Sequence, residues 1–144
     1  MQGSILVISS MSGIMRDAQG HFSYNAAKGA TVHLTKLMSG EFTKLGIRVN
    51  SIAPGYEFQC PLSKNRLLTT FSYFPSEMTA KESGPDQKSE VPDEKIQEKG
   101  HVPMQRAGAD EEMAMAVLML AKNTYVNGEV LAVDGGVLNV VAGR

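Results

Sequence analysis

The pattern of apolar and polar positions predicts that the chain begins with a buried strand followed by a long helix. The strand is the apolar, β-branched run Ile5–Ile8, which ends in two serines and is typical of a parallel sheet. From about Ser23 to Leu45, apolar residues recur at helical spacing, and Gly46 follows as a C-terminal cap. These helical positions are Ala27, Ala30, Leu34, Leu37, Met38, Phe42 and Leu45.

The remainder of the chain predicts two more strands and a shorter helix. Ile47–Ile52 alternates as a strand does, and 53–55 (Ala-Pro-Gly) ends it because proline cannot extend the ladder. Asp110 is expected to cap a helix that runs through Leu120. Residues 125–136 contain a last strand bounded by Asn-Gly and Asp-Gly-Gly turns. Strands that alternate with helices in this way predict an α/β fold.

A polar, proline-punctuated region separates these two parts of the chain, with a helix expected at Glu94–Lys99. Within it, 56–72 carries the lone cysteine, Cys60, and the run Leu67–Phe71 (Leu-Leu-Thr-Thr-Phe), which has no partner pattern. Two interpretations stand for 56–72. It is either a genuine loop insertion, which a fold tolerates because closure entropy rises slowly with loop length, or an unspliced segment of the gene. We favour the unspliced segment, because its removal joins Gly55 smoothly to the residues that follow.

Tyr24 and Lys28 carry the candidate chemistry. They are four residues apart in the predicted helix, so both side chains lie on one face. A phenol titrates near pH ~10, but a neighbouring cation favours phenolate and brings the proton within working range at neutral pH. The pair could give a proton to a carbonyl or take one from an alcohol. The spacing alone is weak evidence for catalysis, since most Tyr and Lys pairs at this spacing are solvated neighbours on a helix surface.

A strand that ends in Ser-Ser-x-x-Gly, a loop, and Tyr-x-x-x-Lys on a helix together resemble the short-chain dehydrogenase/reductase family, in particular its fungal or bacterial 3-oxoacyl-reductase-like members. The resemblance implies that Ser10 holds the substrate oxygen and that Tyr24 is the general acid/base. It also implies that Lys28 lowers the pKa of Tyr24 and binds the nicotinamide ribose. Gly13, three residues after the family's serine, selects Ser10 among the serines of this turn.

The resemblance extends to the cofactor and the substrate. It implies NAD or NADP as cofactor, with contacts from Tyr24, Lys28, Pro54, Gly55 and, if 56–72 is removed, Ser76. It implies a substrate lid in 73–105 and a small-molecule carbonyl or alcohol substrate. In the family the helix that starts near Ser23 contributes to a subunit interface, so a homo-oligomer is expected of a full-length form. Packing of this helix within one chain is an equally weighted alternative.

The length of the chain changes this picture. A chain of 144 residues suits one domain, whereas intact family members are much longer and begin with a half that this sequence does not match. No Gly-x-x-x-Gly-x-Gly turn is present to cradle a dinucleotide phosphate. We therefore expect residues 1–144 to form the C-terminal part of a doubly wound, Rossmann-like parallel-sheet domain. The alternative function is a truncated, non-catalytic fragment that acts at most as a packing or dimerisation piece.

Composition excludes several other classes of protein. The net charge of −1 gives no support for a nucleic-acid partner. A lone cysteine excludes an internal disulfide, and His21, His33 and His101 lack metal-ligand spacing. No apolar run approaches the ~20 residues of a membrane span, and the apolar start is too short for a signal peptide. We expect a cytoplasmic protein with no metal.

Overall fold

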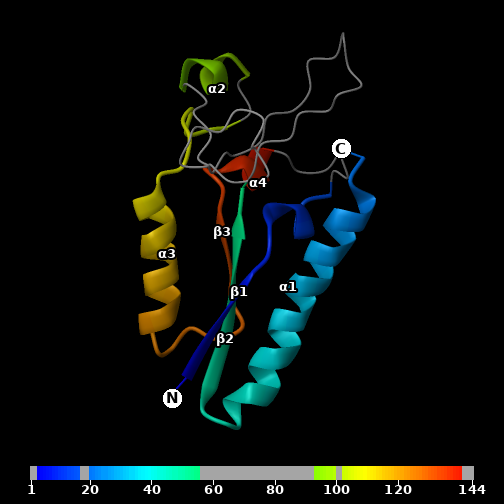
Figure 1. Cartoon of the computed structure of the whole chain (residues 1–144), viewed down its shortest axis with the longest axis vertical. Coiled ribbons are helices and arrows are strands. Elements are labelled where there is room, and N and C mark those ends of the chain that lie inside the picture. Colours follow the sequence, from blue (N-terminus) through cyan, green and yellow to red (C-terminus); the bar gives the residue numbers. More distant parts are fainter. Residues whose placement is uncertain (1–2, 17–19, 56–92, 100–101, 141–144) are drawn as a thin grey trace, which may run out of the picture.

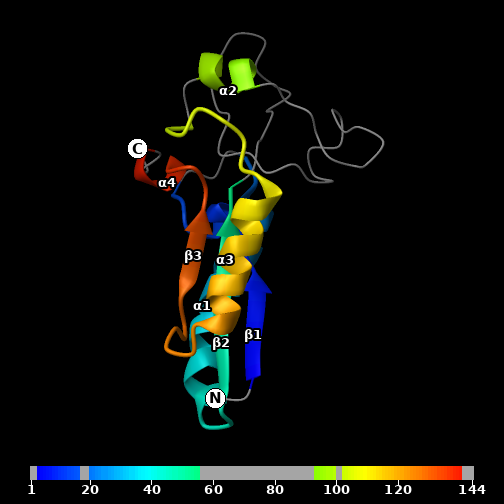
Figure 2. The ribbon, with the colours of Figure 1, turned by 90° about the vertical axis from the view of Figure 1, so that its left-hand side faces the viewer.

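The sheet contains three parallel strands in the order β1-β2-β3. They are β1 (Gly3–Ile8), β2 (Ile47–Pro54) and β3 (Val130–Val133), in a computed structural model that describes residues 3–16, 20–55, 93–99 and 102–140. Helix α1 (Phe22–Thr43) covers one face of the sheet and α3 (Asp110–Lys122) covers the other, as Figures 1 and 2 show. This parallel α/β arrangement, with helices on both faces, confirms the predicted fold class.

Strand β2 is the central strand and the best buried element. In its register with β1, Gly3 lies opposite Ile47 and Ile8 opposite Ile52. Residues 48–53 are all buried, although half of them are polar. Asn50 is fully buried. Its side-chain amide donates to the carbonyl of Val126 (3.0 Å) and accepts from the backbone N–H of Glu129 (3.0 Å), so it pairs two backbone groups of the loop before β3. Polar side chains in β2 therefore tie the sheet to segments far along the chain.

The long helix was predicted correctly in extent, but its packed face was not. Helix α1 ends at Thr43, and Gly46 then adopts a left-handed conformation with φ of 73°. Of the expected apolar stripe, Leu37 and Leu45 are 56% and 71% exposed, whereas Thr35 and Ser39 are the buried residues of the helix. Small side chains allow the helix to approach the sheet closely, and their hydroxyls are satisfied by carbonyls of the same helix.

The start of α3 also differs from the prediction. Asp110 is the first helical residue, and the cap position is Ala109, which has no side-chain oxygen to accept a hydrogen bond. The carboxylate of Glu112 instead accepts from the backbone N–H of Ala109 (2.8 Å). This contact is the reciprocal half of a capping box, and it satisfies one of the donors that a helix start leaves open.

Short elements gather at the carboxyl end of the sheet. They are the 3-10 turn η1 (Met11–Gly13) and the helices α2 (Asp93–Lys99) and α4 (Val137–Val140). The helix predicted at Glu94–Lys99 is confirmed by α2. An apolar cluster joins these elements to the incoming loop through Met11, Ile96, Val102 and Val137. The segment 56–72 and Ser76 lie outside the described residues, as does most of the expected lid.

Candidate active site

The site is built where β1 and β2 end, because the carboxyl ends of parallel strands meet at one edge of the sheet. The strand ladder continues past both elements: Ser9 donates its N–H to the carbonyl of Ile52 (2.8 Å), and Gly55 donates to that of Val133 (3.0 Å). Pro54 pairs with Val133 in the β2–β3 register. The predicted cofactor contacts, Pro54 and Gly55, thus lie one strand away from the serine turn.

Three serines form a buried turn directly after β1. Ser9, Ser10 and Ser12 are at most 3% exposed. The hydroxyl of Ser10 caps η1 by accepting the backbone N–H of Ser12 (3.2 Å), which holds the candidate catalytic oxygen on a rigid turn. Among the described residues, the Ser12 hydroxyl finds no hydrogen-bond partner.

Tyr24 and Lys28 lie in the first turns of α1 and share a face, as their spacing predicts. The ammonium of Lys28 is 5.8 Å from the centroid of the Tyr24 ring, within the range of a cation–π interaction. The same ammonium donates to the carbonyl of Ile8 (3.1 Å) at the end of β1. Tyr24 is half-buried and packs against the apolar cluster that contains Met11.

The structure therefore brings the serine turn and the Tyr24–Lys28 face of α1 together. The residues on either side of Ser10 make the contacts: the hydroxyl of Ser9 donates to the carbonyl of Lys28 (3.1 Å), and Met11 lies in the cluster against Tyr24. A phenol, an ammonium and a serine hydroxyl gathered at the carboxyl edge of a parallel sheet can exchange a proton with a bound oxygen.

Known proteins are similar to this chain in sequence and in fold. A family model described as short chain dehydrogenase matches residues 1–66. D-arabinitol 2-dehydrogenase of Scheffersomyces stipitis is 34% identical over 140 residues, which cover 94% of this chain and 42% of that protein. Sorbose reductase of Candida albicans is 37% identical over 137 residues, which cover 93% of this chain and 40% of that protein.

These matches support membership of the short-chain dehydrogenase/reductase family. A solved structure of ElxO with NADP bound supports the same fold, with a TM-score of 0.60 and 29% identity over 94% of this chain and 46% of that one. The chain thus spans less than half the length of each of these relatives.

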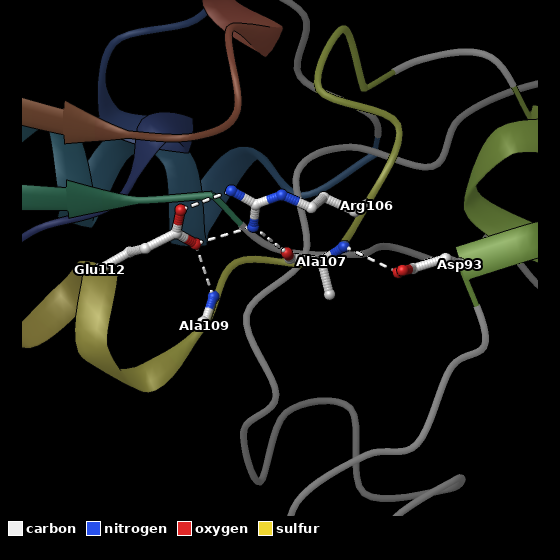
Figure 3. A network of polar contacts seen from close by, with 5 residues as sticks. All are labelled: Asp93, Arg106, Ala107, Ala109 and Glu112. Carbon is white, nitrogen blue, oxygen red and sulfur yellow. Dashed lines mark hydrogen bonds and ion pairs between the residues drawn. The ribbon is translucent and has the colours of Figure 1, made fainter.

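An ion pair that the sequence did not reveal holds the loop before α3. Arg106 donates two hydrogen bonds to the carboxylate of Glu112, and Asp93 accepts the backbone N–H of Ala107 (3.3 Å), as Figure 3 shows. The hydrogen bond from Arg106, reinforced by that from the N–H of Ala109, lowers the pKa of Glu112 to about 2. Glu112 in turn raises the pKa of Arg106. The signal available in the sequence was a glutamate at the third helical position.

This ion pair borders a pocket of about 410 Å³ between residues 103–108 and residues 132–136. The pocket lies at the carboxyl end of β3, on the strand farthest from the serine turn. Within the part of the chain that the structure describes, no three His, Cys, Asp or Glu side chains gather as a metal site would require. No helix in that part is long and apolar enough to cross a bilayer.

Proposed function

We propose that these residues serve reversible hydride transfer between NAD or NADP and a carbonyl or secondary alcohol. The observation that carries the proposal is the seating of the Tyr24–Lys28 face against the serine turn at the end of β1. In this assignment Ser10 polarises the substrate oxygen and Tyr24 exchanges its proton. The nicotinamide cofactor supplies or accepts the hydride.

Lys28 is suited to a double role. An ammonium has three donors, of which one is used on the carbonyl of Ile8. The contact with Ile8 anchors the side chain beside Tyr24, and a remaining donor can hold a ribose hydroxyl. Pro54 and Gly55, at the end of the neighbouring strand, are the residues proposed to face the nicotinamide, with Ser76 as a further contact only if 56–72 is removed.

The relatives suggest which carbonyl compounds to test first. Two of them are named for polyols or ketoses, D-arabinitol with ribulose in one case and sorbose in the other. We propose a small carbonyl or alcohol substrate and place ketoses and their alditols at the head of the panel. Acyl carrier and simple alcohol substrates complete it.

Two proteins test the assignment: the 144-residue chain, and a chimera in which residues 3–140 replace the matching segment of the sorbose reductase. Cofactor oxidation and reduction are followed optically with both NADH/NAD and NADPH/NADP. The chain carries no Gly-x-x-x-Gly-x-Gly turn, so the hydride donor lacks its phosphate anchor there and we expect turnover in the chimera alone.

Tyr24→Phe in the chimera keeps the aromatic ring and removes the phenolic hydroxyl with its transferable proton. We expect turnover to fall by about 10²-fold or more, with cofactor affinity nearly unchanged. The matched control is Tyr125→Phe, because Tyr125 is 99% exposed and remote from the serine turn in sequence. If Tyr24→Phe retains most of its turnover, Tyr24 is not the acid/base.

A second candidate function is a non-catalytic packing or dimerisation piece. It is supported by the outer face of α1, where Leu34 and Leu37 are 49% and 56% exposed. Sedimentation of the 144-residue chain and of its Leu37→Glu variant tests this role. If the unsubstituted chain sediments as a monomer, it forms no dimer through Leu37, and the dimerisation function is refuted.

A further inference from the structure

Gly13 is in direct contact with the backbone of α1. A Cβ atom built on Gly13 would lie 2.5 Å from both the carbonyl carbon and the carbonyl oxygen of Lys28, and 2.8 Å from the nitrogen of Gly29. These atoms belong to a helix backbone and cannot swing aside as the end of a side chain can. The φ angle of Gly13 is not positive, so the turn conformation does not require a glycine. The close contact with α1 requires it.

Two more contacts converge on the same residue of the helix. The hydroxyl of Ser9 donates to the carbonyl of Lys28 (3.1 Å), and the ammonium of Lys28 donates to the carbonyl of Ile8 (3.1 Å). Ile8, Ser9 and Gly13 flank Ser10 on both sides. The turn between them is stiffened by the hydrogen bond that Ser10 accepts from the N–H of Ser12.

We infer that the Lys28 peptide is the docking point that sets the position of the Ser10 hydroxyl relative to Tyr24, and that Gly13 and Ser9 are positioning residues for the proposed reaction. The inference rests on the proposed function. Bringing a methyl group on Gly13 to an ordinary van der Waals distance requires the turn to move by about 1 Å, and a misplacement of this size costs a reaction about 100-fold.

The test compares Gly13→Ala and Ser9→Ala with Gly40→Ala. Gly40 lies in α1, the helix that Gly13 contacts, is exposed and has nothing within 4 Å of its would-be Cβ, so it controls for a glycine-to-alanine change in itself. In the labelled 144-residue chain, we expect Gly13→Ala and Ser9→Ala to shift the amide signals of Ser10 and the ring signals of Tyr24. Gly40→Ala should leave both sets in place.

The kinetic arm uses the chimera. Gly13→Ala should lower kcat by about 100-fold with little change in the KM of the cofactor, and Ser9→Ala should lower kcat by a smaller factor, since it removes one hydrogen bond and adds no clash. Ser9→Ala keeps the test open if Gly13→Ala does not fold. Unmoved Ser10 and Tyr24 signals, or a kcat per folded molecule within about twofold of the parent in both variants, would overturn the inference. An inactive parent chimera would refute the proposed function instead. The spectra of the labelled 144-residue chain would still test whether the Lys28 peptide positions Ser10 and Tyr24.

Discussion

Arg48 offers the sharpest test of how the sheet is held together. It lies in β2, is 3% exposed, and sends its guanidinium to the end of α3. One terminal nitrogen donates to the carbonyls of Leu120 (2.8 Å) and Val126 (3.0 Å), and the other donates to that of Ala121 (2.6 Å). Two of these carbonyls belong to the last turn of the helix, where partial negative charge favours a cation.

The expected effect of Arg48→Met follows from these contacts. Methionine conserves much of the volume but has no donor, so three carbonyls lose a charged partner. A hydrogen bond to a charged group contributes about 1.5–3 kcal/mol, and water can reach the carbonyls at the helix end once the guanidinium is gone. We therefore expect the free energy of unfolding to fall by about 2–4 kcal/mol, because each buried carbonyl left without a donor costs about 1–3 kcal/mol and water relieves part of that cost.

The assay is urea unfolding followed by circular dichroism, together with amide hydrogen exchange in α3. The matched control is Lys44→Ala, because Lys44 pairs with Glu41 on the surface with both side chains at least 70% exposed, and we expect it to change stability by no more than about 0.5 kcal/mol. Equal losses for Arg48→Met and Lys44→Ala would show that the buried guanidinium does not hold α3 to the sheet.

Two further outcomes are expected. The carboxylate of Glu112 has its pKa lowered to about 2 from an ordinary 4.5, so the stability it contributes is fully present above about pH 4.5 and is lost as the pH falls to 2. In acid titrations, Glu112→Gln should therefore lower stability at pH 5 and converge with the parent near pH 2, while Glu111→Gln follows the parent; a constant gap would contradict the assignment. Gly128 has φ of 78° and its would-be Cβ lies 2.8 Å from the Ser39 hydroxyl, so Gly128→Ala should cost more than about 1 kcal/mol. Adding Ser39→Ala should recover part of this loss, and no recovery would mean that the contact is not the cause.

Periodicity located the main elements because each is a local pattern. The apolar run of β1, the spacing in α1 and the turns around β3 are encoded within a few residues, and the elements form where predicted. The packed face of α1 was not predictable in this way. Burial depends on the opposing surface, and the sheet selects Thr35 and Ser39 over the larger leucines.

In the candidate site, too, local patterns were predictable and contacts between distant residues were not. Spacing placed Tyr24 and Lys28 on one face, and the motif pointed to the serine turn. The contacts that organise the site involve partners distant in sequence or backbone atoms, which no pattern displays. The Gly13 contact with the Lys28 peptide is of this kind, and so are the carbonyls that Arg48 reaches more than 70 residues away.

The order β1-β2-β3 has a consequence for the newly made chain. Strand β2 can pair with β1 as soon as Pro54 has been synthesised, but its other edge waits for Val133. At about 5–20 residues per second, that interval lasts roughly 4 to 16 s, during which the central strand presents an open edge. For most of this interval Arg48 and Asn50 lack their partners, which lie near the end of α3 and just before β3. Nascent chains stalled within this window should recruit holdase chaperones, and chains released after Val133 should not.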